Sequence, residues 1–109
     1  MPKVSIVIPA YNEEKYIGRL LASLQKLPLE NILEIIVVDN CSVDKTKEIV
    51  LSAVSFLPKL RLIDESRKGV AWARTRGVKE SSGEIIAFLD ADTYVSEKWL
   101  KMILDVFFC

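Results

Sequence analysis

The pair Asp90 and Asp92, separated by one alanine, has the chemistry of a metal site. It follows an apolar, β-rich run at 84–89, and side chains two positions apart on an extended strand share a face. Two carboxylates held that close repel each other unless a cation lies between or beside them. Mg²⁺ and Mn²⁺ commonly take one or two protein carboxylates and fill their other positions with water and phosphate oxygens. The pair therefore predicts a metal-bound diphosphate, with the alternative that both aspartates are turn and cap residues.

Polar residues also follow two earlier apolar runs, in the segments 9–13 and 39–40. The carboxyl ends of parallel strands meet at one edge of a sheet, so these segments should lie close to the aspartate pair. Tyr11 in the first segment can offer its ring to a planar base, or it can be a half-buried packing residue. Asp39 in the second, taken alone, is explained as the cap of the following helix.

A cluster of basic residues lies between the third and fourth apolar runs. Its default interpretation is a solvated helix face, but a pyrophosphate at the same edge of the sheet would give one or two of these side chains a ligand. Neither the glycine-rich dinucleotide motif nor the P-loop motif occurs in the sequence. The basic cluster consists of Arg67, Lys68, Arg74, Arg76 and Lys79.

The elements that must position these residues alternate between short β-rich runs and amphipathic stretches. This pattern predicts an α/β fold, with about four parallel strands covered by helices in one half of a doubly wound, Rossmann-like architecture. The first strand should end at Pro9, which has no N–H for a central strand, and Asn12 should cap the first helix with Glu13 and Glu14 in its first turn. The expected strands are 4–8, 34–39, 60–63 and 84–89, and the expected helices follow Asn12, Ser42 or Asp44, Gly69 and Ser96.

The composition limits the classes of function. The chain has 109 residues, enough for one domain, and its 15 basic and 15 acidic side chains leave no net charge with which to attract nucleic acid. Histidine is absent, which excludes imidazole catalysis, Ser-His-Asp triads and histidine-rich zinc sites. Cys41 and Cys109 form no C-x-x-C motif, and the first residues lack the apolar segment of a signal peptide. We expect a cytoplasmic protein, with peripheral attachment to the cytoplasmic membrane face as the alternative.

Four segments, in this order and spacing, resemble the family 2 glycosyltransferases over essentially the whole chain. They are 4–14 with Pro9-Ala10-Tyr11-Asn12-Glu13, 34–40 ending in Asp39-Asn40, 68–78 beginning at Lys68-Gly69, and 83–92 ending in Asp90-Ala91-Asp92. The resemblance implies a GT-A fold of three αβα layers, a nucleotide-diphosphate sugar donor, Mg²⁺ or Mn²⁺, and inverting transfer to a sugar, lipid or protein acceptor. Residues 1–109 would form a single nucleotide-sugar-binding domain, the N-terminal half of a full catalytic domain.

The resemblance also implies roles for individual residues. Asp92 would be the main metal ligand, and Asp90 would lie against the ribose and the metal-bound diphosphate. Tyr11 would lie beside the base, Glu13 would lie near the ribose, and Asp39 would accept a hydrogen bond from the base. The whole set of substrate-binding residues implied in this way is Pro9, Ala10, Tyr11, Glu13, Asp39, Lys68, Arg74 and Asp90.

Asn40 and Cys41 depart from the family pattern, which often has a second aspartate followed by glycine. Asn40 can still hydrogen-bond but carries no charge, and Cys41 accepts a positive φ less easily than glycine does. The geometry of this turn is therefore the part of the pattern that the sequence leaves open.

The sequence offers no convincing general base for the acceptor hydroxyl. Asp64 and Glu65 follow the third strand, and we expect them to be loop carboxylates that face water. Transfer by this chain alone should therefore be weak or absent. The alternative is a non-catalytic module that binds a nucleotide or self-associates through its apolar C-terminal helix. That helix bears Leu100, Ile103, Leu104, Phe107 and Phe108.

Overall fold

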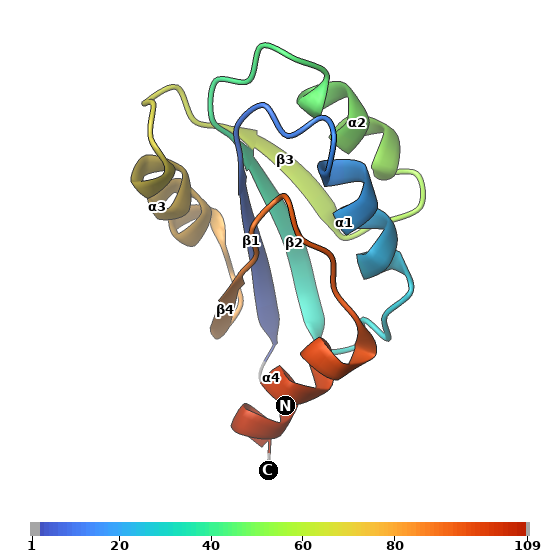
Figure 1. Ribbon diagram of the computed structural model, residues 1–109. Coiled ribbons are helices and arrows are strands. Elements are labelled where there is room, and N and C mark those ends of the chain that lie inside the picture. Colours follow the sequence, from blue (N-terminus) through green and yellow to red (C-terminus); the bar gives the residue numbers. More distant parts are fainter. Residues whose placement is uncertain (1–2, 109) are drawn as a thin grey trace.

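The computed structural model describes residues 3–108, without the side chains of residues 107 and 108. Strands and helices alternate along the chain in the predicted order (Figure 1). Most boundaries lie within two residues of those expected. The elements are β1 (Val4–Ala10), α1 (Ile17–Gln25), β2 (Ile32–Asp39), α2 (Thr46–Ala53), β3 (Leu60–Asp64), α3 (Val70–Glu80), β4 (Ile85–Phe88) and α4 (Glu97–Phe108).

The four strands form one parallel sheet in the order β3-β2-β1-β4. Helices α1 and α2 cover one face of this sheet and α3 covers the other, which gives the three αβα layers that were predicted (Figure 1). The chain winds outward from β1 to β3 and then crosses to the opposite side of β1 to form β4. A doubly wound sheet reverses direction at such a point, and ligands bind at the carboxyl ends of the strands there.

The first strand does not end at Pro9, as predicted, but continues through Ala10. Pro9 lies opposite Val38 of β2 in the ladder. The Val7 carbonyl accepts a hydrogen bond from the Leu89 N–H, so the backbone groups of Val7, and those of Pro9 two residues later, face the β4 side. Because β4 ends at Phe88, the missing N–H of Pro9 lies where no strand needs it.

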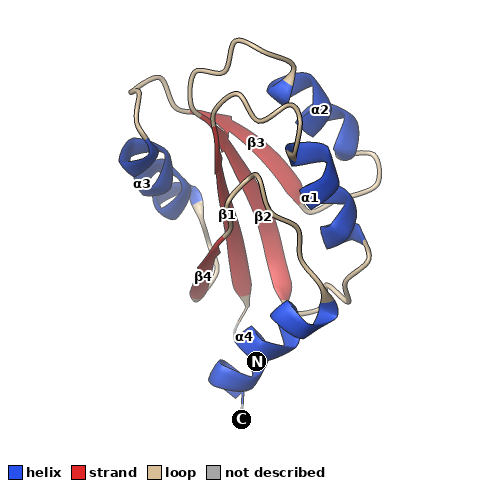
Figure 2. Ribbon diagram, in the orientation of Figure 1, coloured by secondary structure: helices blue, strands red, loops and turns tan. Residues whose placement is uncertain are grey.

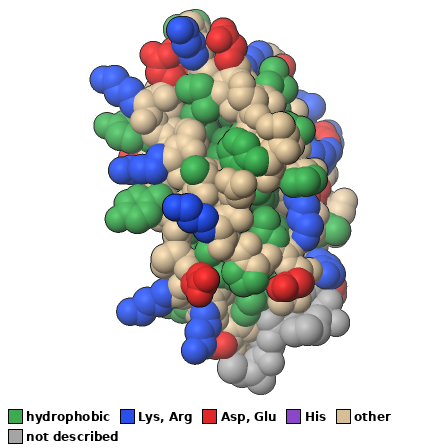
Figure 3. Space-filling view, turned by 90° about the vertical axis from the view of Figure 1, so that its right-hand side faces the viewer, with side chains coloured by type: hydrophobic (Ala, Val, Ile, Leu, Met, Phe, Trp, Pro, Cys, Tyr) green, Lys and Arg blue, Asp and Glu red, His purple; other side chains and the backbone are tan. Residues whose placement is uncertain are grey.

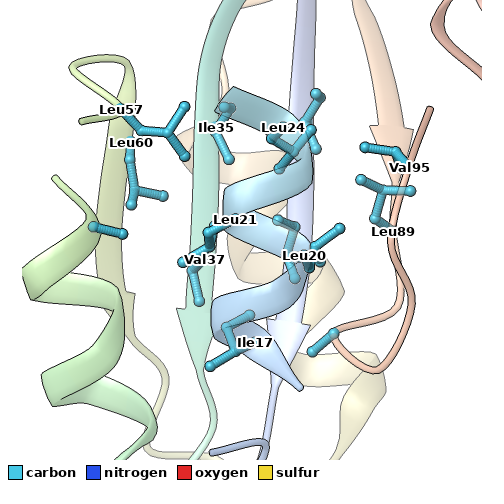
Figure 4. Close-up of a cluster of buried hydrophobic side chains, with 14 of the residues drawn as sticks. Ile17, Leu20, Leu21, Leu24, Ile35, Val37, Leu57, Leu60, Leu89 and Val95 are labelled. Atoms are coloured by element: carbon cyan, nitrogen blue, oxygen red, sulfur yellow. The ribbon is translucent and has the colours of Figure 1, made fainter. Parts of the chain in front are cut away.

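The larger core lies between the sheet and the α1–α2 layer. Four side chains of α1 spaced three or four residues apart are fully buried against β1 and β2, as the helical pattern predicted (Figure 4). Each such side chain contributes roughly 1.5–3 kcal/mol by leaving water. They are Ile17, Leu20, Leu21 and Leu24.

A smaller core lies on the opposite face, under α3. It contains Val7 of β1, Ile36 and Val38 of β2, and Ala73 of α3. Since Ile35 and Val37 of β2 belong to the larger core, β2 is buried on both faces, as its continuous apolar run predicted.

Gly77 allows α3 to lie close to β1. A Cβ added at this position would lie 2.3 Å from Cγ1 of Val7, closer than two such carbons can approach. The glycine that weakens the helical pattern in the sequence is therefore a packing requirement of the α3–sheet contact.

The terminal helix α4 lies at the amino end of the sheet (Figure 1). Leu100 is buried in the larger core, whereas Met102 and Val106 are exposed. The alternative of self-association through this helix rests in part on Phe107 and Phe108, whose side chains lie outside the described residues. Within residues 3–108, no helix combines the length and the apolar character needed to cross a bilayer.

The surface over α1 and α2 carries basic and acidic side chains that are interspersed rather than segregated (Figure 3). The equal numbers of basic and acidic residues leave no net charge, and the described part of this face shows no large patch of one sign. A ligand must therefore be recognised by local groups, and the carboxyl ends of the strands are the place to examine.

Candidate functional site

A cavity of about 280 Å³ opens at the carboxyl end of β1, between β1 and the start of α3. Four residues that the sequence nominated for substrate binding, Pro9, Ala10, Tyr11 and Lys68, lie in its wall. Asn40, Gly69, Val70 and Ala73 complete the lining. The cavity lies where the strand order reverses, the position at which doubly wound sheets bind their ligands.

Tyr11 and Lys68 form the mouth of this cavity. The Lys68 ammonium lies 5.1 Å from the centre of the Tyr11 ring, and the Tyr11 side chain is about half exposed. A partly open aromatic face can stack on a planar base, and a neighbouring cation can meet a phosphate. The pair therefore suits a nucleotide.

Asp39 ends β2 and is paired in the sheet with Ala10, which lines the cavity, but Asp39 itself lines a second hollow with Ser42, Lys47 and Asp64. Its side chain is buried, and its Oδ2 accepts a hydrogen bond of 3.2 Å from the backbone N–H of Ser42. Its Oδ1 is also buried and has no hydrogen-bond partner among the described residues. A buried acceptor without a partner is costly, so this oxygen is the described side-chain atom that most needs a hydrogen-bond donor.

The turn after β1 is bound to the turn after β2 (Figure 2). The Asn12 N–H donates to the Ser42 hydroxyl at 2.8 Å, and the Val43 N–H donates to Oδ1 of Asn12 at 2.9 Å. The prediction that Asn12 caps the first helix is therefore wrong. Asn12 has a left-handed φ of 51°, and α1 begins only at Ile17, with no acidic residue in its first turn. The side chain that could have capped α1 is used to join the two turns.

Cys41 occupies the position where the family often has glycine, and it adopts the positive φ of 69° that this turn needs. Its thiol donates to the carbonyls of Glu65 and Ser66. Ser42 and Asp44 were the two expected caps of α2. Asp44 accepts the Thr46 N–H at 2.9 Å, whereas the Ser42 hydroxyl accepts the Asn12 N–H from the turn after β1.

Glu13 connects the first turn with the aspartate pair. The pKa of Glu13 is raised, first by its partial burial and then by the negative charges of Asp92, Asp44 and Asp90. The negative charges of Asp92, Asp44 and Asp90 are therefore near enough to act on Glu13. Among the described residues, no three His, Cys, Asp or Glu side chains converge as a ready-made metal cage. A site for Mg²⁺ or Mn²⁺ does not need one, because these ions keep several waters.

Asp90 and Asp92 do not lie on an extended strand, in contrast to the prediction. β4 ends at Phe88, and the Thr93 N–H donates to the Asp90 carbonyl at 3.2 Å in a turn that contains both aspartates. Their orientation is set by this turn rather than by the alternation of a strand.

The sequence did not identify the residues that hold this turn. The Arg19 guanidinium of α1 donates to the Asp92 carbonyl at 3.3 Å and lies 4.9 Å from the Tyr94 ring. The Ser23 hydroxyl accepts a hydrogen bond of 3.0 Å from the Val95 N–H. Arg19 and Ser23 lie one turn apart on α1. In the sequence, the only sign of their role is that each is a polar residue next to the buried apolar stripe of this helix.

Arg74 is not brought into the cavity. It is exposed on α3, and its guanidinium lies 6.0 Å from the Phe88 ring. Of the basic cluster, Lys68 alone lines the cavity described above.

Glu65 does not face water, which corrects the prediction for this carboxylate. Its side chain is only 2% exposed and accepts hydrogen bonds from the backbone and guanidinium of Arg67, with Arg76 at 3.8 Å. The hydrogen bonds from Arg67 lower the pKa of Glu65 to about 2. Asp64 is 67% exposed, as expected, and pairs with Lys47.

The chain belongs to glycosyltransferase family 2, because the model of that family, described as glycosyl transferase family 2, matches residues 5–108. Its fold is the GT-A type of Rossmann-like α/β fold. It is 37% identical over 103 residues to poly(ribitol-phosphate) beta-N-acetylglucosaminyltransferase TarS of Staphylococcus aureus, and 39% identical over 104 residues to glycosyltransferase AglE of Haloferax volcanii. Each match covers 93% of this chain, but only 18% of TarS and 34% of AglE.

Two solved structures show the same arrangement of elements. The crystal structure of TarS residues 1–349 in complex with UDP-GlcNAc has a TM-score of 0.84 and 35% identity, over 95% of this chain and 31% of that one. The mannosyltransferase PcManGT from Pyrobaculum calidifontis, in complex with GDP-Man and Mn²⁺, has a TM-score of 0.82 and 30% identity, over 91% and 30%. Those two glycosyltransferases therefore hold nucleotide-sugar donors on the same fold.

Proposed function

We propose that this chain is the donor-binding portion of a glycosyltransferase, which holds a nucleotide-diphosphate sugar across the carboxyl end of its sheet. The observation that carries the proposal is the buried Oδ1 of Asp39, which has no partner among the described residues, on a residue whose sheet partner Ala10 lines the cavity with Tyr11. Uracil and guanine both present a ring N–H that a carboxylate can accept. Adenine presents an acceptor nitrogen instead.

The diphosphate would extend from this cavity toward Asp90 and Asp92. Lys68 supplies a cation on the way, beside Tyr11. A divalent metal ion would lie at the far end, where Asp90 and Asp92 offer carboxylate oxygens and water completes the coordination. When bound, Mg²⁺ or Mn²⁺ would neutralise charge on the leaving diphosphate.

Transfer also needs a carboxylate that deprotonates the acceptor hydroxyl on the face opposite the leaving group, if the reaction inverts the sugar. We assign no described carboxylate to that role. The relatives that this chain matches are several times longer than the matched segment. We propose that turnover requires an acceptor-binding portion that residues 3–108 do not supply, and that the chain alone binds donor without efficient transfer.

Calorimetric titration tests the proposal, with UDP, GDP and ADP each added in the presence of Mn²⁺, Mg²⁺ or a chelator. We expect binding of UDP or GDP that weakens at least tenfold in chelator, and weaker binding of ADP under all conditions. Asp92→Asn should remove the metal dependence, whereas Asp105→Asn, the same change on an exposed residue of α4, should not. Failure of both UDP and GDP to bind would overturn the proposal, and equal affinity with and without metal would overturn the metal role.

A further inference from the structure

Asn40 makes a set of hydrogen bonds that requires an amide side chain. Its Nδ2 donates to the carbonyl of Glu65 at 3.0 Å and to the carbonyl of Arg67 at 2.8 Å. Its Oδ1 accepts the N–H of Gly69 at 2.8 Å. Asn40 is only 4% exposed, so water cannot replace these partners.

An aspartate of the same shape could not make these bonds. An ionised carboxylate has no N–H to donate, and two carbonyl oxygens would face one of its oxygens at hydrogen-bond distance. The departure from aspartate to Asn40, which the sequence left unexplained, therefore has a local physical reason.

The three hydrogen bonds of Asn40 join the end of β2 to the segment 65–69, which ends at Gly69 directly before α3. This segment forms one wall of the cavity through Lys68 and Gly69. Gly69 has a φ of 132°, which only glycine adopts readily, and it leads directly into α3. The position of this wall thus depends on Asn40, which also lines the cavity itself.

We propose that Asn40 is a positioning residue, which sets where Lys68 and Gly69 stand and so fixes the width of the nucleotide cavity. The inference rests on the proposed function only for the identity of the ligand. The hydrogen bonds that carry it belong to the chain itself.

Trp72 offers a spectroscopic readout of this segment. The Arg67 guanidinium lies 4.0 Å from the Trp72 ring, and a Cβ on Gly69 would lie 3.7 Å from Cδ1 of Trp72. The chain has two tryptophans, so in a Trp99→Phe background the emission comes from Trp72 alone.

The test compares Asn40→Asp with Asn31→Asp, both in the Trp99→Phe background. Asn31 precedes β2 at the opposite end of the sheet and receives the same isosteric change. We expect Asn40→Asp to shift the Trp72 emission and its quenching by iodide, and to lower the affinity for UDP with Mn²⁺ about tenfold or more. Asn31→Asp should change neither quantity. If Asn40→Asp does not fold, Asn40→Ala removes the same bonds without the repulsion and takes the same two measurements.

The two readouts separate the outcomes. Unchanged emission overturns the positioning role, even if the affinity falls, because Asn40 would then act on the nucleotide directly. Changed emission with unchanged UDP affinity also overturns it, because the bonds would then be structural only. If the unsubstituted chain binds neither UDP nor GDP, the proposed function fails, and the emission still decides whether Asn40 holds the segment 65–69.

Discussion

The turns after β1 and β2 are held from several sides, whereas the turn after β4 is held mainly from one. Asn12, Ser42 and Val43 link the first two turns to each other, and Asn40 links the second to the segment before α3. The turn that carries Asp90 and Asp92 is attached through two residues of α1, Arg19 and Ser23. The part of the site suited to a base is therefore preorganised within this chain, and the part suited to a metal-bound diphosphate is less constrained.

The strands that lead into these turns, β2 and β4, also differ in how far they are buried. β2 is buried along most of its length, whereas the side chains of β4 are only partly buried and Phe88 is 45% exposed. Local opening is easiest where few apolar contacts hold an element. We therefore expect amide hydrogens of β4 to exchange before those of β2.

The largest expected effect is at the contact between α3 and β1. Gly77→Ala places a Cβ against Val7 and should lower the free energy of unfolding by about 1–3 kcal/mol. Gly18→Ala in α1 is the matched control, since its Cβ would meet Ile49 at an ordinary 3.5 Å. It should raise the free energy of unfolding by about 0.5–1 kcal/mol, because alanine favours a helix. Denaturant titration measures both, and equal effects of the two changes would contradict the packing role of Gly77.

Asp39→Asn should weaken the binding of UDP or GDP roughly tenfold to hundredfold, through loss of a charge-assisted hydrogen bond. The free energy of unfolding of this variant should change little, because the amide oxygen of the new side chain can still accept the Ser42 N–H. Asp64→Asn, on the exposed neighbour in β3, should leave the affinity unchanged. Calorimetry of both variants decides, and an unaltered affinity for Asp39→Asn would remove this residue from the site.

Ser23→Ala tests the weaker region. It leaves the Val95 N–H without its partner and should lower the metal-dependent part of the UDP affinity roughly fivefold, or about 1 kcal/mol. Ser52→Ala is a matched control. The hydroxyls of Ser23 and Ser52 each donate to a carbonyl of the preceding turn, but no hydrogen bond among the described residues joins Ser52 to a turn of the site. Titration of UDP should show the lower affinity with Mn²⁺ and no change in chelator. A lower affinity in chelator as well would mean that the base end of the site is also affected.

The last change, at Glu65, shows itself through the pH dependence of stability. Because the folded-state pKa of Glu65 is about 2, below its ordinary value, the pair with Arg67 stabilises the fold at neutral pH. This stabilisation should diminish as the pH falls from about 4.5 toward 2. Glu65→Gln should flatten that part of the stability curve, measured by denaturant unfolding from pH 6 to pH 2 (about 4 pH units). The same steepness in both proteins would contradict the role of this pair.

Much of the fold could be predicted, because burial leaves a periodic mark on the sequence. The apolar run of β2 is continuous because this strand packs on both of its faces. The apolar residues of α1 recur with helical spacing because this helix packs on one face. The end of β1 was misplaced at Pro9, because the sequence does not show that β4 stops before the position where an N–H would be needed.

The site was predicted in outline, because parallel strands bring their carboxyl ends together. Its internal bonding was not. Asn12 has the composition of a helix cap but joins two turns that are 30 residues apart, and Glu65 resembles a loop carboxylate until Arg67 folds back on it. Such partners depend on tertiary geometry, which propensity and spacing do not encode.

The division of the site into a base end and a diphosphate end is tested by comparing UMP with UDP, each titrated with Mn²⁺ and with chelator. Under the proposed function the base end is preorganised in this chain and the diphosphate end needs a cation, so UDP should bind more tightly than UMP only when metal is present. In chelator the two nucleotides should bind alike. A UDP advantage that persists undiminished in chelator, or a UMP affinity that depends on metal as strongly as that of UDP, would contradict the division of the site between Asp39 and the turn of Asp90 and Asp92.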